Sequence, residues 1–364
     1  MSSRENRIMG LFGLGKTPGL GIDINTDAVK ALELLPQGDS YQITRVAELP
    51  LPKNLITDDE ITDIEQLSKT LQQLRKKSGS TVKEVVAAVS GSQAISKQIA
   101  VGNELDDEAI AEKIESEAEA LIPFPIAEVR YDFESLGEHP TLPGQQRILV
   151  TATRTVSVDS RVEALEQAGF KVKIMDVDSQ AILRSCNYLL PHLAPEIVAS
   201  PLPVLVLDIS ITAVQTIVIA QGEVTFTRFQ TGGLQPLLKA LDDNGNGEYR
   251  EILARLRAGE TGSDSSLIIQ DSLTNLWSQV SRGIQIYQSN APKKGFAGVI
   301  LVNTGAMLPM LSDYIDQQID EPVLSLNPFD HFELADSYSH LRAHGPRFVE
   351  VLGLALRSFT PWHT

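Results

Sequence analysis

Two aspartates stand in closely similar surroundings in the two halves of this chain. Residues 21–29 read GIDINTDAV and contain Asp23, and residues 206–214 read VLDISITAV and contain Asp208. Each pattern predicts a buried strand with Asp near its end, a tight polar turn, and a second strand that leaves in the opposite direction. Small turn residues let backbone N–H groups approach an anion, and a carboxylate beside them suits a hydrated Mg²⁺ ion. The pair therefore predicts a site for a phosphate chain and Mg²⁺.

A duplicated hairpin also predicts a duplicated half. The second strands of the two hairpins are expected over residues 30–35 and 215–220. A chain of 364 residues exceeds what one hydrophobic core usually organises. We therefore expect an α/β protein with the actin-like ATPase (ribonuclease H-like) duplicated fold, in which two lobes face each other and their turns meet across a cleft.

Composition restricts the partners and the compartment. The formal net charge of −16 argues against nucleic acid and against an anionic membrane surface, because both recruit Lys and Arg. Cys186 is the single cysteine, so an intramolecular disulfide is excluded and a reducing cytoplasm fits. The longest apolar stretch, 204–220, is interrupted by Asp208 and reads as two strands. We expect a cytoplasmic protein without direct membrane insertion.

Two further stretches match part of a known binding motif but lack the neighbouring residues that the motif requires. Residues 10–17 read GLFGLGKT, but no strand pattern precedes them and Pro18-Gly19 follows where a phosphate loop needs a helix. Residues 1–17 are therefore predicted to be a flexible leader. Residues 242–247 resemble the start of a calcium loop, yet the position that requires a bidentate Glu is Leu253. The six histidines show no zinc-ligand spacing.

The middle of the first half carries a unit of its own. After an amphipathic helix predicted over 58–77 and a strand over 82–89, residues 106–121 form a strongly acidic helix that Ile122-Pro123-Phe124-Pro125 ends. Strands are predicted over 129–135 and 147–153, a helix over 157–168 and a strand over 172–176. We interpret this region as a subdomain inserted in the first lobe.

From about Pro18 to Phe359 the sequence resembles the PilM family, actin-like cytoplasmic proteins of type IV pilus assembly that are related to the cell-division protein FtsA. The stretches that carry the resemblance are Gly21–Ile24 with Val29, Lys30 and Glu33; residues 117–125 (EAEALIPFP) with Tyr131 and Leu136-Gly137; Asp208-Ile209 with Gly232-Gly233; and Asn327-Pro328-Phe329. The acidic helix end is the most specific of these, since it marks the inserted subdomain.

The resemblance implies a division of the chain into five parts after the leader. These are a first lobe (subdomain 1A) at 18–90 and 171–200, an FtsA-type insert (1C) at 91–170, a second lobe (2A) at 201–236 and 298–335, a helical subdomain (2B) at 237–297, and a C-terminal helix within 336–364 that returns to the first lobe.

The resemblance also implies ATP and Mg²⁺ as cofactors. Asp23 and Asp208 would hold the metal, and Asp178 at a strand end would align a water for hydrolysis or cap the following helix. The remaining nucleotide residues would be Asn25, Thr26, Lys30, Ser210, Gly232, Gly233, Arg282, Thr304 and Gly305.

The sequence departs from the family where the phosphates should lie. Asn25 and Ser210 replace a glycine of each hairpin turn, and of a third run of glycines only Gly305 remains, while Gln279 replaces an acidic residue beneath the adenosine. A side chain in left-handed geometry costs about 1–2 kcal/mol and crowds a phosphate. We therefore expect weakened or lost ATP binding, and at most a slow ATPase.

The partner that the resemblance implies is the N-terminal cytoplasmic tail of a PilN-type inner-membrane protein, held beside the insert at Ser90, Gly91, Phe124 and Pro125. The chain would then be a scaffold that is peripheral to the inner membrane. Pilus motor ATPases and a second copy of the chain are further candidate partners. Two alternatives stay open: a functional ATPase of the actin superfamily, and the actin-like arm of a type II secretion protein of the GspL type.

Overall fold

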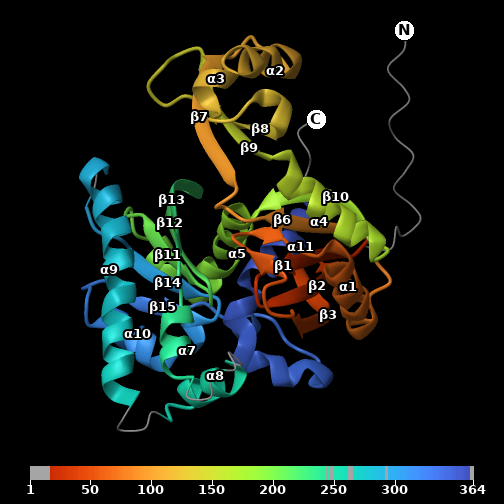
Figure 1. Ribbon diagram of the computed structural model, residues 1–364. Helices are drawn as coiled ribbons and strands as arrows, with labels where there is room; N and C mark the ends of the chain where they lie inside the picture. Colours follow the sequence, from red (N-terminus) through yellow and green to blue (C-terminus); the bar gives the residue numbers. More distant parts are fainter. Residues whose placement is uncertain (1–16, 243–244, 246–248, 261–264, 292–293, 361–364) are drawn as a thin grey trace.

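The computed structural model describes residues 17–242, 245, 249–260, 265–291 and 294–360 (Figure 1). The expected leader, apart from Thr17, and most of the calcium-loop-like stretch therefore lie outside the described residues. Two α/β lobes lie side by side, and a small insert projects above them in the view of Figure 1. The first lobe contains the red strands β1 to β3, the orange β6 and the yellow-green β10, and the second contains the green to blue strands β11 to β15.

The two lobes contain five-stranded sheets of equivalent topology. The order is β3-β2-β1-β6-β10 in the first lobe and β13-β12-β11-β14-β15 in the second, with three antiparallel strands followed by two parallel ones in each. The strands of the first sheet are β1 (Gly19–Ile24), β2 (Ala28–Gln37), β3 (Ser40–Pro50), β6 (Glu84–Val89) and β10 (Lys171–Val177). Those of the second are β11 (Val204–Ile209), β12 (Ala213–Ala220), β13 (Glu223–Thr231), β14 (Gly298–Val302) and β15 (Val323–Ser325). The predicted duplication of the hairpin is confirmed.

Helices α5 (Asp178–Leu193) and α11 (Val349–Arg357) pack against each other, α11 also packs against β1, and α5 contacts β10 of the first sheet and β13 of the second. At their crossing a Cβ on Gly353 would lie 1.8 Å from the carbonyl oxygen of Ala181, so only glycine fits. Ile182 of α5, Leu352 of α11, Leu32 of β2 and Ile217 of β12 share one buried core. A continuous apolar core therefore runs through both lobes.

The second lobe is covered by helices on one side of its sheet. They are α7 (Gln235–Ala240), α8 (Arg250–Arg257), α9 (Ser266–Asn290) and α10 (Pro309–Asp316). Short helical segments complete the described chain: α6 (Pro195–Val198), η3 (Gly305–Met307), η4 (Pro328–Asp330) and η5 (Asp336–Phe348). Among the described helices, α9 included, none combines the length and the apolar character that crossing a membrane requires.

The insert is narrower than the predicted range 91–170. It consists of a sheet of order β7-β9-β8 with helices on it: β7 (Ala94–Gly102), α2 (Asp107–Ser116), α3 (Ala118–Leu121), η1 (Ile126–Glu128), β8 (Val129–Glu138) and β9 (Gln145–Arg154). Its own core contains Ile110, Ile114 and Ile148. The next helix, α4 (Thr155–Gln167), instead buries Ala164 and Leu165 in the core of the first lobe, so the insert ends with β9.

The helix predicted over 58–77 is wrong at its start. Residues 56–61 form the small hairpin of β4 (Ile56–Thr57) and β5 (Glu60–Ile61), and α1 (Ile64–Ser78) begins after it. Asp58 and Asp59 adopt the left-handed φ values of 51° and 63° that such a two-residue turn requires. Asp63 is the true N-cap, since its side chain accepts a hydrogen bond from the N–H of Gln66 at 2.9 Å.

Candidate functional site at the interlobe cleft

A cleft lies where the turns of the two hairpins meet. Its volume is about 560 Å³, counting the space open to solvent, and both Asp23 and Asp208 line it. The two turns touch directly, because the hydroxyls of Thr26 and Thr212 lie 2.9 Å apart. The structure thus brings the two sequence-predicted aspartates from opposite lobes to one cavity.

The walls of this cleft are strongly acidic. Asp59, Asp178 and Glu350 of α11 line it together with the two hairpin aspartates, and the buried Arg161 of α4 is the cation among the lining residues. Burial is the main reason why the pKa of Glu350 lies well above its usual value, and the nearby aspartates raise it further. Such a wall favours cations and disfavours an isolated phosphate chain.

The first hairpin neutralises its aspartate internally. Asp23 lies directly opposite Lys30 in the register of β1 and β2, and Lys30 Nζ is 2.5 Å from Asp23 Oδ2. Both side chains are buried. Burial alone would lower the pKa of Lys30, but the attraction of Asp23, together with that of Asp27 and Glu48, outweighs it and raises this pKa. Lys30 is therefore a structural counter-ion, in a position predicted from the sequence to bind nucleotide.

The second hairpin lacks that counter-ion. Asp208 lies opposite Gln215 in the equivalent register of β11 and β12. Gln215 donates instead to Asp178 Oδ1 at 3.2 Å, and the buried Oδ1 of Asp208 has no hydrogen-bond partner among the described residues. Burial raises the pKa of Asp208 to about 7, although its hydrogen bond with the Asn303 side chain acts in the opposite direction. Asp208 is thus the carboxylate of the cleft that would gain most from a bound cation.

Asp178 connects three parts of the molecule. From the first turn of α5 its Oδ2 accepts the N–H of Gly91 at 2.8 Å, and its Oδ1 accepts from Gln215 of the second lobe. A Cβ on Gly91 would lie 2.4 Å from Gln215 Nε2, so a side chain here would displace the amide of Gln215 from its present position. Burial raises the pKa of Asp178 to about 6 against these hydrogen bonds. Both carboxylate oxygens are engaged in holding protein groups together.

The turn amides that would approach a phosphate are bonded to neighbouring side chains. The N–H of Thr26 donates to Asn25 Oδ1 at 2.7 Å, and the N–H of Ala213 donates to Ser210 Oγ at 3.0 Å. In the third loop the N–H of Thr304 donates to Asn303 Oδ1 at 2.9 Å. In each loop, therefore, a side chain of the loop accepts the hydrogen bond of one backbone N–H group.

The expected backbone strain at Asn25 and Ser210 is not present. Neither residue has a positive φ, so the cost of left-handed geometry does not arise at these positions. The left-handed residues in this region are Asp59, which lines the cleft with φ of 63°, and Asn303 of the third loop, with φ of 67°. The replacement of glycine acts through side-chain hydrogen bonds and not through strain.

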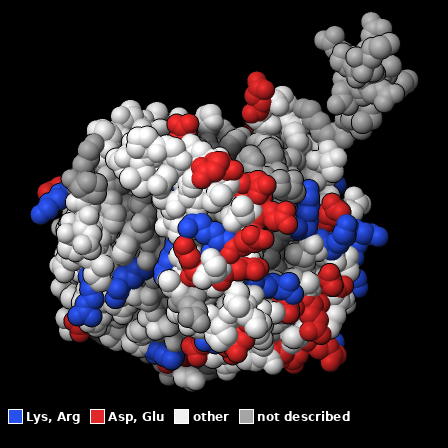
Figure 2. Space-filling model, turned by 90° about the horizontal axis from the view of Figure 1, so that it is seen from above, with Lys and Arg blue, Asp and Glu red and all other residues white. Residues whose placement is uncertain are grey.

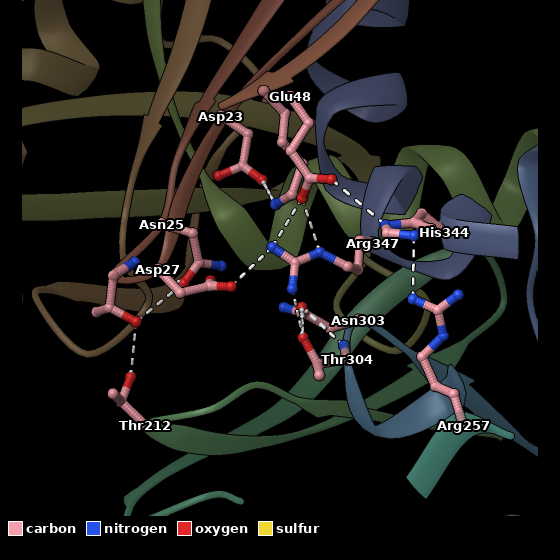
Figure 3. A network of polar contacts seen from close by, with 12 residues as sticks. Asp23, Asn25, Asp27, Glu48, Thr212, Arg257, Asn303, Thr304, His344 and Arg347 are labelled. Atoms are coloured by element: carbon pink, nitrogen blue, oxygen red, sulfur yellow. Dashed lines mark hydrogen bonds and ion pairs between the residues drawn. The ribbon is translucent and has the colours of Figure 1, made fainter. Parts of the chain in front are cut away.

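An arginine that the sequence analysis missed joins the lobes beside the cleft. Figure 3 shows Arg347 of η5 extended between the first-lobe carboxylates and Thr304 of the second lobe. Its Nη2 lies 2.7 Å from both Asp27 Oδ2 and Glu48 Oε1, and its Nη1 donates to Thr304 Oγ1 at 2.9 Å. Arg347 is 8% exposed. No local motif could have indicated it, because its partners are remote in the sequence.

His344 extends this network to α8. Its Nδ1 lies 3.6 Å from Glu48 Oε2, and its Nε2 is 3.0 Å from Arg257 Nη1. Burial would raise the pKa of Glu48, but the neighbouring His344 and the charge of Arg347 lower it to about 2. Glu48 is therefore ionised throughout the physiological range.

The glycines predicted to contact nucleotide support the second hairpin. Gly232 and Gly233 have φ values of 115° and 48°, and a Cβ on Gly233 would lie 2.5 Å from the carbonyl oxygen of Ser210. A Cβ on Gly305 would lie 2.6 Å from the Cβ of Ile209, so this loop also packs closely against the second hairpin.

The two α9 residues named for the predicted nucleotide site, Gln279 and Arg282, do not line the cleft. Gln279 lines a second cavity between α7 and α9, together with Gly233 and Leu237. Arg282 is exposed on α9 and lines neither of these two cavities.

The residues predicted to bind the partner lie at the neck of the insert, which we define as residues 90–94, 124–129 and 153–157. Ser90 lines the cleft, and Gly91 bonds Asp178. Phe124 is half-buried, packs in a small cluster with Ile122, Val129 and Ala152, and has the guanidinium of Arg154 4.6 Å from its ring centroid. Pro125 is exposed.

The cleft fits one part of a magnesium nucleotide and not the other. The unpartnered oxygen of Asp208 suits an ion that keeps its waters. Within the described residues, no group of three or more His, Cys, Asp or Glu is arranged to hold a metal. The phosphate cradle fits less well, because one backbone N–H group of each hairpin turn is already bonded to a side chain.

Comparisons with known proteins agree with this architecture. A family model described as type IV pilus assembly protein PilM matches residues 21–359. A solved structure titled "PilM-PilN type IV pilus biogenesis complex" is 24% identical with a TM-score of 0.78, covering 94% of this chain and 99% of that one. The ethanolamine utilization protein EutJ from Carboxydothermus hydrogenoformans is 13% identical with a TM-score of 0.54, covering 95% of this chain and 91% of its own. The two lobes thus have the predicted actin-like fold.

The raised pKa of Asp208 predicts a pH dependence of stability. Folded Asp208 binds a proton below about pH 7, whereas the unfolded residue does so only below about pH 4, so stability rises as pH falls from 8 to 5. Asp208→Asn should stabilise the protein at pH 8, and this advantage should shrink by about 2 kcal/mol at pH 5. Calorimetric unfolding at both pH values measures it. A constant difference would contradict it, and exposed Asp271→Asn is the control.

The Arg347 network predicts a large effect of one truncation. Arg347→Ala leaves Asp27 and Glu48 without their shared cation and should cost about 3 kcal/mol, because two partly buried carboxylates lose their partner. Arg342→Ala in the same segment removes an ion pair with Asp330 whose side chains are both 55% exposed, and should cost less than about 1 kcal/mol. Thermal unfolding of both variants compares them. Equal losses would show that the network adds no stability.

Proposed function

The chain belongs to the family of type IV pilus assembly protein PilM, and on that premise we propose that it is an actin-like scaffold that binds the N-terminal cytoplasmic tail of a PilN-type inner-membrane protein. The scaffold would be cytoplasmic and peripheral to the inner membrane through this partner. The observation that carries the proposal is the neck of the insert, where apolar surface and an open strand edge occur together.

Apolar side chains are exposed at the neck. Ile126 is 40% exposed and Val156 is 62% exposed. Both lie just beyond the register pair of Val129 and Arg154, at the end of the sheet where Phe124 packs. Exposed apolar side chains gathered in this way are typical of a docking surface. This surface supports capture of an apolar segment of a tail.

The neck also offers backbone groups. β8 is an edge strand in the order β7-β9-β8, so one side of it has no strand partner. An extended peptide can add to such an edge through main-chain hydrogen bonds, while pockets for alternate side chains give specificity. A strand of a PilN-type tail along β8, with an apolar residue against Phe124, is the mode of binding that we propose.

The acidic face of the insert supports a basic tail. Figure 2 views the molecule from the side of the insert and shows Asp and Glu side chains gathered over the middle and right of this face. Asp107, Glu108 and Glu115 of α2 are exposed there. A tail rich in Lys or Arg would associate faster through this field, and the rate would fall with salt.

Nucleotide is proposed to bind weakly or not at all. Asn25, Ser210 and Asn303 each accept the hydrogen bond of a loop amide, so those amides have little left to offer a phosphate. The acidic wall of the cleft adds a further cost for a phosphate chain. On this view the lobes form a frame for partner binding.

A slow ATPase is the second candidate, favoured by one observation. The unpartnered Oδ1 of Asp208 in the cleft is suited to a hydrated Mg²⁺ ion, and a magnesium nucleotide would supply a phosphoryl group for transfer to water. Asp208 would then hold the ion through its water shell, and Asp178 would have to release Gln215 before it could orient a water. The family match favours pilus assembly over an arm of the GspL type.

Tail capture at the neck predicts the effect of one substitution. Phe124→Glu places a charge in the apolar surface and should weaken binding of a fluorescent synthetic PilN-type tail at least about tenfold by anisotropy titration. Leu142→Glu is the matched control, because Leu142 is 42% exposed in the hairpin at the far end of the insert. Unchanged capture by Phe124→Glu would remove Phe124 from the binding surface.

The bonded turn amides predict that ATP binding can be improved. Wild-type protein should give no calorimetric heat with ATP and Mg²⁺ at micromolar concentrations. The double change Asn25→Gly and Ser210→Gly frees the amides of Thr26 and Ala213 and should tighten binding about tenfold.

The control for this experiment is Asn54→Gly. Asn54 is exposed and already left-handed, with φ of 58°, and it does not line the cleft. Its replacement should leave ATP binding as in the wild type. Micromolar affinity of the wild-type protein itself would contradict the proposal of weakened binding.

A further inference from the structure

The insert is connected to the first lobe by the chain and to the second lobe by side chains. The chain enters the insert after β6 and leaves it into α4, and both elements belong to the first lobe. Arg147 of the central insert strand β9 nevertheless pairs with Glu223 of β13 in the second lobe. We propose that this ion pair holds the insert to the second lobe, so that the orientation of the insert follows the relative position of the lobes.

The geometry of the pair is suited to positioning. Arg147 Nη1 lies 2.8 Å from Glu223 Oε2, and Arg147 Nη2 lies 2.9 Å from Glu223 Oε1. This bidentate arrangement fixes direction as well as distance. Arg147 Nη2 also donates to the carbonyl oxygen of Leu136 on the neighbouring strand, so the guanidinium is oriented by the insert itself. The side chains of the pair are only 24% and 28% exposed.

Glu223 is also held in position, by the hairpin turn that precedes it and by a contact of that turn with α5. It follows the two-residue turn of Gln221 and Gly222, whose φ values of 54° and 80° belong to a tight hairpin between β12 and β13. Asn187 of α5 donates to the carbonyl oxygen of Gly222 at 3.1 Å and ties this turn to the helix between the lobes. The anchor point therefore moves with the second lobe and not as a free loop.

A second contact couples the root of the insert to the same lobe. Gly91, directly after β6, donates to Asp178, and Asp178 accepts from Gln215 of β12. The absence of a side chain at Gly91 lets these groups approach. A rotation of the lobes must therefore either break the contacts at both points or carry the insert along. Any ligand that changes the lobe angle would then alter the neck, and a partner at the neck would alter the cleft by the same coupling free energy.

The chain offers a matched control for this pair. Arg130 of β8 also forms an ion pair, in which its Nη2 lies 2.8 Å from Asp159 Oδ1 of α4. That pair joins the insert to the first lobe, to which the insert is already connected, and its side chains are 59% and 51% exposed. Removing it should leave the insert anchored to the second lobe.

The experiment measures the distance between the insert and the second lobe by spin labels at Leu142→Cys and Ser278→Cys. Ser278 is exposed on α9, and the native Cys186 is buried, so it does not take a label. With the pair intact the distance distribution should be narrow. Arg147→Ala and Glu223→Ala should each broaden it about twofold, the exchange of Arg147→Glu with Glu223→Arg should restore it, and Arg130→Ala should leave it unchanged.

An unchanged width in Arg147→Ala and Glu223→Ala would overturn the inference, as would equal broadening by Arg130→Ala. The consequence for the partner rests on the proposed function and has its own measurement. Anisotropy titration of the PilN-type tail should show about fivefold weaker binding to Arg147→Ala and recovery in the charge exchange. If the tail fails to bind even the wild-type protein, the proposed function is wrong. The distance distributions would still test the inference about the ion pair.

Discussion

The structure depends on how two buried carboxylates at equivalent strand ends are neutralised. Asp23 and Asp208 occupy the same place in the duplicated sheet, yet the residue opposite is Lys30 in one lobe and Gln215 in the other. The first lobe therefore contains its own counter-ion. The second lobe leaves a carboxylate that either binds a proton near neutral pH or requires a cation from outside. The two equivalent aspartates therefore differ, since Asp23 is paired with a lysine and Asp208 has an oxygen without a partner among the described residues.

This difference has a consequence beyond the cleft. Gln215 has no aspartate to neutralise, so its amide is free to reach Asp178 across the lobes. Asp178 in turn holds the amide of Gly91, where the insert leaves the first lobe. The difference between Lys30 and Gln215 at equivalent strand positions thus connects the second hairpin to the neck of the insert. Gln215 supplies no counter-ion to Asp208 but forms an interlobe contact.

The sequence predicts the parts of this structure that depend on local patterns. The repeated hairpin and the acidic helix were found because apolar periodicity and turn residues act over a few positions. The helix α4 was also predicted from its apolar periodicity. That periodicity does not indicate which hydrophobic core the apolar face joins, and the structure shows that it packs in the core of the first lobe. Asn25 was recognised as a departure from glycine, whereas the hydrogen bond that its side chain accepts from the next amide could not be predicted, because it depends on a rotamer. Arg347 was missed because Asp27, Glu48 and Thr304 lie far from it in the chain.

The interlobe contacts show how side chains can hold the two lobes of an actin-like frame together. Arg347 joins Asp27 and Glu48 to Thr304, and the hydroxyls of Thr26 and Thr212 meet between the hairpin turns. Contacts of this kind, built from the side chains of both lobes, favour the arrangement of the lobes seen here without any ligand. If a flexible tail binds at the neck as we propose, a neck that is already positioned would need less ordering, and ordering is a large cost of such complexes. Weak nucleotide binding and a preorganised docking surface are therefore compatible parts of one proposal.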